Sequence, residues 1–142
     1  MRAMLRKALK QAFEKIYPHP FAFGTGFLEE INGGAYTLPC IWVCPFELAG
    51  KTGRSEGTKT YVGTICLLEP SEGLSPEEKD DMWDIMEQSA LDVLSDMLET
   101  VDEVVAFEKI KCIPDEGAYT GFNDISQKLT FEVTLKYCED RG

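Results

Sequence analysis

Several kinds of functional residue are scarce in this sequence. Its 142 residues include one histidine, and 14 Lys and Arg face 25 Asp and Glu, which gives a formal net charge of -11. A protein that grips nucleic acid needs a basic surface for the phosphates, so we expect no sequence-specific nucleic-acid binding. A single histidine leaves little room for a zinc cluster or for histidine-dependent catalysis. We therefore expect no cofactor, no metal site and no enzymatic activity.

The cysteines show no pairing pattern. There are five of them, an odd number, and they are scattered among apolar runs without any CxxC spacing. Small buried thiols in a reducing compartment are more typical of this pattern than a disulfide framework is. We predict free thiols at Cys40, Cys44, Cys66, Cys112 and Cys138.

Long hydrophobic runs are absent as well. No segment approaches the ~18 consecutive apolar residues of a membrane span. The start of the chain interleaves charged and apolar residues, which is unlike a secretory signal. We expect a protein that is made and used in a cytoplasm and has no membrane partner.

What the sequence does contain predicts one globular domain over residues 1–142. Its mass of 15.9 kDa and its 44% hydrophobic residues are those of a chain with a single core. Residues 2–17 repeat apolar side chains at i, i+3, i+4 and i+7, which predicts an amphipathic helix that ends before Pro18. Residues 76–101 predict a second helix, because Ser75 and Glu78 form a capping-box pattern in front of an apolar stripe.

The rest of the chain shows the pattern of strands and turns. Asn32-Gly33-Gly34 predicts a hairpin turn. In the last strand Leu129, Phe131, Val133 and Leu135 alternate with polar residues and are predicted to face the core. Strands are predicted at 21–30, 36–48, 59–69, 104–113 and 129–138, with polar loops at 49–58 and 114–124. The order α-β-β-β-α-β-β predicts an α+β domain, an antiparallel sheet with two helices packed on one face.

Charge asymmetry between the two helices gives the first candidate interaction surface. The first helix carries five bases and one acid on its outer face, whereas residues 72–103 hold twelve acids and one base. Within one chain these faces would pair or be solvated, but between copies they would be complementary and would favour self-association. The candidate oligomer contacts are Arg2, Arg6, Lys10, Asp84, Asp92 and Asp96.

The polar loop at 49–58 is the second candidate. It carries Lys51 and Arg54, with Lys59 directly after it, and it is an extension that the core does not need. An interaction role and a plain hairpin tip are the two alternatives. His19 lies between two prolines, and we interpret it as a surface residue of a linker, since nothing places a nucleophile and an acid beside it.

The order of the elements, together with several of their sequences, resembles one known family. These sequences are Tyr36-Thr37-Leu38-Pro39-Cys40-Ile41-Trp42-Val43, the strand from Tyr61 to Leu68, the helix opening Leu74-Ser75-Pro76-Glu77-Glu78, and Asp124-Ile125 before the closing strand. The chain is similar in these features to the tail-terminator, or tail-completion and head–tail joining, proteins of bacteriophages and prophages.

This resemblance implies a non-enzymatic structural subunit that forms a homo-oligomeric ring, commonly a hexamer, at the junction of tail and head. It implies tail-tube and head-connector proteins as partners. It also implies a place in the virion and, during assembly, in the cytoplasm of a bacterial host. The alternative is a small acidic cytoplasmic adaptor or inhibitor that binds a basic partner through helix 76–101. A third hypothesis is an enzyme with a carboxylate or thiol site.

Overall fold

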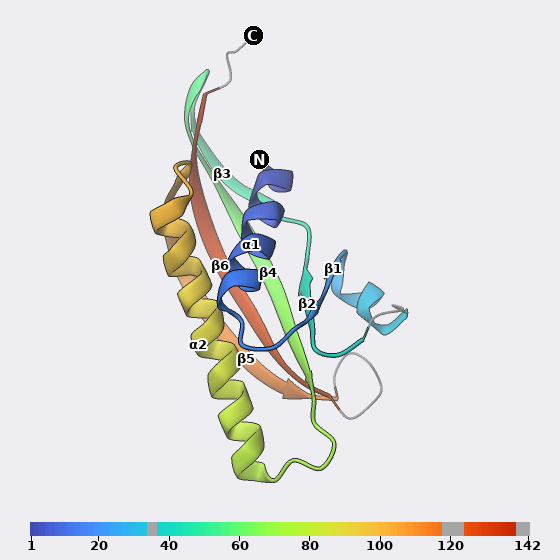
Figure 1. Cartoon of the computed structure of the whole chain (residues 1–142). Coiled ribbons are helices and arrows are strands. Elements are labelled where there is room, and N and C mark those ends of the chain that lie inside the picture. Colours follow the sequence, from blue (N-terminus) through green and yellow to red (C-terminus); the bar gives the residue numbers. More distant parts are fainter. Residues whose placement is uncertain (34–36, 118–123, 139–142) are drawn as a thin grey trace.

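A computed structural model describes residues 1–33, 37–117 and 124–138 (Figure 1). In them the chain forms two α-helices, a short 3-10 helix and a six-stranded sheet. In chain order the elements are α1 (Arg2–Ile16), β1 (Ala22–Thr25), η1 (Leu28–Gly33), β2 (Cys40–Val43), β3 (Glu47–Gly53), β4 (Glu56–Pro70), α2 (Pro76–Thr100), β5 (Val104–Glu116) and β6 (Asp124–Cys138).

The sheet is built around β4 and β6, which pair antiparallel from Glu56–Cys138 to Pro70–Asp124. The strand order is β1-β2-β4-β6-β5, and β3 also pairs with β4. All neighbours are antiparallel except β1 and β2, which are parallel. The predicted α+β class, with a mostly antiparallel sheet, is confirmed.

Both helices lie side by side on one face of the sheet, and the main core lies between helices and sheet (Figure 1). The capping box at the start of α2 is confirmed, since the amide of Glu78 donates to Ser75 Oγ and the amide of Ser75 donates to Glu78 Oε1. The apolar stripe of α1 is buried, as its period predicts, at Leu5, Leu9, Ala12 and Phe13.

The last strand faces the core as predicted. Leu129, Phe131, Val133 and Leu135 are all buried, and the residues between them are more exposed. A shift of one residue would have turned this whole set to the opposite face.

A smaller apolar cluster lies on the opposite face of the sheet, beneath η1. Its buried members are Ile31, Cys40, Trp42, Cys44, Cys66 and Leu68. The strand residues between them, such as Ile41 and Leu67, belong to the main core. This part of the sheet is therefore covered on both faces, which explains why strand β2 is apolar at every position.

The predicted strands 21–30 and 36–48 are shorter in the structure, at Ala22–Thr25 and Cys40–Val43, and three further local predictions are wrong. Asn32 and Gly33 lie in η1 and not in a hairpin turn, while Gly34 lies outside the described residues. Because β1 and β2 are parallel, a tight hairpin between them is geometrically excluded. The predicted loop at 114–124 is also shorter, since β5 continues to Glu116 and β6 begins at Asp124.

The third error concerns 49–58, which is a β-hairpin and not an irregular loop. Residues Glu47–Gly53 form β3, and β4 begins at Glu56. Every residue of β3 is exposed, so no burial pattern marks the strand in the sequence. Backbone pairing with β4 holds it in place. The element order therefore contains one more strand than predicted. No helix in the described ranges has the length and apolar character of a membrane span.

Candidate functional site

The hairpin of β3 and β4 continues beyond the helices as a three-stranded projection (Figure 1). We call residues 47–60 and 134–138 the arm, because the end of β6 pairs with the start of β4 along it. Tyr137 fixes its tip, since its hydroxyl lies within hydrogen-bond distance of three backbone carbonyls and reaches that of Gly53 at 3.0 Å. Gly53 has a φ of +83°, which favours glycine at this turn.

Two of the residues predicted as an interaction loop share one face of the arm. The ammonium groups of Lys51 and Lys59 lie 5.3 Å and 5.0 Å from the ring centre of Tyr137. Such cation–π contacts hold a cation in place without neutralising it. Arg54 lies at the exposed turn. The arm therefore presents basic side chains on a fixed scaffold.

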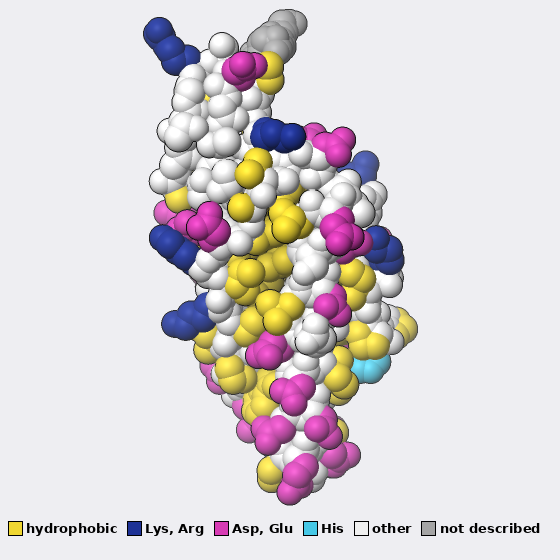
Figure 2. All heavy atoms as spheres, turned by 90° about the vertical axis from the view of Figure 1, so that its left-hand side faces the viewer, with side chains coloured by type: hydrophobic (Ala, Val, Ile, Leu, Met, Phe, Trp, Pro, Cys, Tyr) yellow, Lys and Arg dark blue, Asp and Glu magenta, His cyan; other side chains and the backbone are white. Residues whose placement is uncertain are grey.

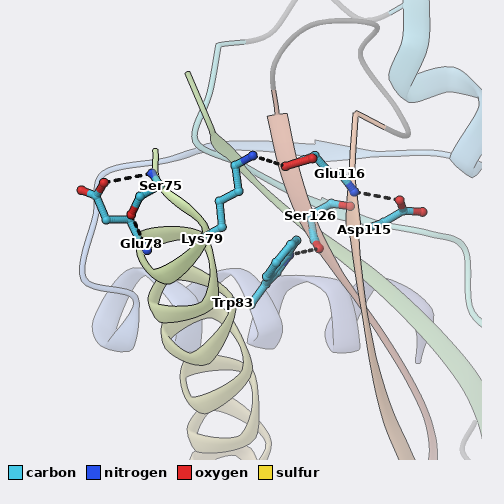
Figure 3. Close-up of polar contacts among 7 residues, drawn as sticks. All are labelled: Ser75, Glu78, Lys79, Trp83, Asp115, Glu116 and Ser126. Carbon is cyan, nitrogen blue, oxygen red and sulfur yellow. Dashed lines mark hydrogen bonds and ion pairs between the residues drawn. The ribbon is translucent and has the colours of Figure 1, made fainter. Parts of the chain in front are cut away.

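At the end of the sheet that lies opposite the arm, side chains of α2 bind to β5 and β6 (Figure 3). Lys79 Nζ lies 2.6 Å from Glu116 Oε1, and the indole of Trp83 donates to the carbonyl of Ser126 at 2.9 Å. The single base of this acidic segment is therefore already paired with a carboxylate. The outer surface of α2 is left strongly negative.

A continuous apolar surface lies between α2 and the edge strand β5. Figure 2 shows hydrophobic side chains gathered there, beside the acidic side chains of the helix. Leu98, Val105 and Ile110 are the most exposed of them, at 48%, 47% and 42%. Half-buried side chains of both elements complete the α2–β5 face, which we define as Leu91, Leu98, Val105, Phe107, Ile110 and Cys112.

The groups around Cys112 indicate which side of α2 faces β5. Burial, and then the carboxylate of Glu87, raise the pKa of the Cys112 thiol. Glu87 therefore lies close to β5. Leu91 and Leu98 follow Glu87 at i+4 and i+11, so they lie on the same side of α2.

The predicted basic contacts on α1 partly serve the fold. The guanidinium of Arg2 donates to the carbonyl of Phe46 and lies over the ring of Tyr61. The ammonium of Lys10 lies 5.7 Å from the ring centre of Phe23. Arg6 is exposed. The structure does not bring these three cations to the predicted acids, because α1 meets α2 through Lys15.

The predicted acidic contacts lie on different sides of α2. Asp96 forms an ion pair with Lys15 at 2.6 Å, so α1 and α2 do pair within one chain. Asp92 accepts from the amide of Gln88 at 2.8 Å. Asp84 is exposed. That copies of the chain also associate through these residues stays a prediction.

A polar cluster that the sequence did not reveal joins α1 to β4. Glu69 is buried, and its Oε2 lies 2.5 Å from the hydroxyl of Tyr17 and 2.9 Å from Nδ1 of His19. His19 also borders an open hollow of about 500 Å³ with Pro20, Phe21, Leu38 and Pro39. The two partners of Glu69 are about 50 residues away in the chain, so no local pattern predicts the cluster.

None of the five cysteines is in a disulfide bond, as predicted. Burial raises the pKa of Cys40 and Cys44 to about 11, the latter also through nearby Glu29, so neither is a reactive thiolate at neutral pH. In the described part of the chain, no group of three or more His, Cys, Asp or Glu side chains is placed to hold a metal ion.

Comparisons with known proteins give no family. No family model matches the chain, and no curated protein matches it. The chain is similar to a solved structure, the core region of PilO from the type IV pilus system of Pseudomonas aeruginosa, with a TM-score of 0.34 and 10% sequence identity. The match covers 82% of this chain and 96% of that one. A similarity of this size assigns no function to this chain.

These findings overturn the predicted resemblance to phage tail terminators. No phage family matches, and the solved structure comes from a pilus system and not from a virion. The predicted ring at the tail–head junction and the place in a virion, or in the host cytoplasm during assembly, are therefore wrong, while the predicted partners stay a prediction. The alternative, an adaptor or inhibitor that binds a basic partner through helix 76–101, gains no support from them either.

Proposed function

We propose that this chain is a non-enzymatic protein that acts by associating with a second copy of itself through the α2–β5 face. The open apolar surface between α2 and β5 is the observation that carries the proposal. Large apolar side chains that gather on one exposed surface are typical of protein contacts, whereas single ones are ordinary.

The make-up of the face favours a second copy as the occupant. One helix and one edge strand form it side by side, and both carry exposed apolar side chains, Leu98 on α2 and Val105 and Ile110 on β5. A two-fold axis parallel to α2 would place β5 of one copy over α2 of the other. Leu98 of each copy would then lie over the apolar side chains of the partner's β5, as an isologous contact requires.

The size of the face predicts a weak dimer. Burying the exposed halves of Leu98, Val105 and Ile110 contributes on the order of 1 kcal/mol each. Six such side chains in a dimer barely exceed the lower estimates of the cost of association, which begin at about 4 kcal/mol. Association should therefore depend on protein concentration.

Sedimentation equilibrium over a range of protein concentrations tests the proposal. The wild type should form a dimer that weakens at least tenfold in Leu98→Asp/Ile110→Asp. Ile85→Asp is the matched control, because Ile85 has a similar exposure of 38% but lies on the side of α2 away from β5. Circular dichroism establishes that each variant is folded. A wild-type monomer at every concentration, or equal weakening in the control, would show the proposal to be wrong.

A further inference from the structure

The arm carries cations that the rest of the described chain does not neutralise. Its bases are Lys51, Arg54, Lys59 and Lys136, and its acids are Glu47 at the base and Glu56 at the tip. None of these four bases forms an ion pair with a described residue. In a chain with a net charge of -11, this is a local excess of positive charge.

The arm is rigid enough to present these cations in fixed positions. Besides the Tyr137 contacts at the turn, the hydroxyls of Thr52 and Thr58 lie 2.7 Å apart across the hairpin. A surface that is already ordered loses little conformational entropy when a partner binds. The irregular pairing of β3 near Ala49 makes edge-to-edge sheet extension unfavourable, which leaves the side chains as the binding groups.

An acidic surface, opposite in charge to the arm, lies at the other end of the molecule. Glu77, Asp81 and Asp84 follow one another at i, i+4 and i+7 in the first half of α2, and all three are exposed. They therefore form one outward stripe near the start of α2, and Asp84 lies two turns before Leu91 on the same side of the helix.

The arm cannot reach this stripe within one chain. Helix α2 has 25 residues and is about 37 Å long, and it starts at the end of the molecule opposite the arm (Figure 1). Charges on exposed side chains are screened beyond about 8 Å at physiological salt. Any direct neutralisation of the arm by this stripe must come from another molecule.

We propose that the arm is a docking surface for the acidic stripe Glu77, Asp81 and Asp84 of a second copy. The contact joins two different surfaces, so it is heterologous, and it uses neither Leu98 nor Ile110. It can therefore form when the α2–β5 face is disrupted at Leu98 and Ile110. Nucleic acid is a poorer partner, because the rest of the molecule is strongly negative and repels phosphates.

Light scattering in the Leu98→Asp/Ile110→Asp background separates this contact from the α2–β5 face. At low salt this variant should still associate, and the association should weaken at least tenfold at physiological salt. Lys51→Glu/Arg54→Glu should abolish it. Arg6→Glu/Lys7→Glu is the matched control, since it changes the net charge equally on exposed residues of α1 and should leave association unchanged.

A charge swap tests the partner. Adding Glu77→Lys/Asp81→Lys to Lys51→Glu/Arg54→Glu should restore association, because both sides of the contact are reversed together. If association is lost in Arg6→Glu/Lys7→Glu, the basic contact lies on α1 and not on the arm, and the proposal is overturned. Self-association that is unchanged in Lys51→Glu/Arg54→Glu would also overturn the proposal. The same holds if the arm residues are needed for binding of duplex DNA but not for self-association. Circular dichroism checks the fold of every variant.

Discussion

The hydroxyl of Tyr17 lies 2.5 Å from Oε2 of Glu69, so the residue that ends α1 is joined to a buried carboxylate in β4. His19 contacts the same oxygen from the exposed side. Glu69 therefore joins the first helix and the linker after it to the end of β4, an inner strand of the sheet. The contact spans 52 residues of sequence.

Replacing this carboxylate should weaken the fold. Glu69→Gln keeps the shape but gives Tyr17 and His19 a neutral acceptor, and we expect a loss of about 1–3 kcal/mol in the free energy of unfolding. Urea denaturation at neutral pH measures it. Glu72→Gln, at a nearby exposed position, should change stability by less than about 0.5 kcal/mol. Equal effects of both changes would contradict the role given to Glu69.

Tyr17 should make stability depend on alkaline pH. Burial first, and then the hydrogen bond and charge of Glu69, raise the pKa of Tyr17 far above its usual value. The folded state therefore holds this proton more tightly than the unfolded state does. Its contribution is complete below about pH 10 and falls as pH rises above that value. In urea titrations between pH 9 and 11, the free energy of unfolding should fall less steeply with pH in Tyr17→Phe than in the wild type. Tyr137→Phe, which also removes one phenol, should have a smaller effect on this slope.

Phe131 and Gly63 form one packed unit in the centre of the sheet. Phe131 is buried and contacts the rings of Phe46 and Phe107. Phe131→Ala should cost about 3–5 kcal/mol in the free energy of unfolding. A loss below about 1 kcal/mol would mean that the strand does not face the core as described.

The neighbour of Phe131 gives a second test of the same packing. A Cβ added to Gly63 would overlap the ring of Phe131, so Gly63→Ala should cost about 1–3 kcal/mol through overpacking. In Gly63→Ala/Phe131→Leu the two losses should not add, because the smaller side chain makes room for the new methyl group. Thermal denaturation of the two single variants and the double variant measures the difference.

The cysteines should react in the order of their exposure. Cys138 is exposed, Cys112 is half-buried, and Cys40, Cys44 and Cys66 are buried. At pH 8 an aromatic disulfide reagent should modify Cys138 first and reach the three buried thiols only after denaturation. Cys138→Ser should remove the fast phase. Rapid modification of all five thiols in the native protein would contradict the packing beneath η1.

The sequence predicts some elements well because their signals are local. The capping box of α2 is read from Ser75 and Glu78, and the alternation from Leu129 to Leu135 identifies the buried face of β6. Strand β3 has no such signal, because all seven residues are exposed and only pairing with β4 makes them a strand. The parallel pairing of β1 and β2 likewise joins residues 18 positions apart in the sequence, so no local turn signal predicts it.

The candidate sites were predicted only where charge is dense along the chain. Lys51 and Arg54 are close in sequence, so the arm could be identified as a basic segment before its shape was known. The α2–β5 face could not, because Leu98 and Ile110 come from different elements and each alone is an ordinary exposed side chain. The same holds for Glu69 and His19, whose contact exists only in the folded chain.

The position of β6 has a consequence for synthesis of the protein. This strand lies between β4 and β5 in the sheet, yet it follows both of them in the sequence. Before β6 has been synthesised, β4 and β5 each have an unpaired edge, and the core beneath the helices lacks the side chains of β6. The sheet can close only when this segment has emerged, so a nascent chain stalled before Asp124 should be a client for chaperones.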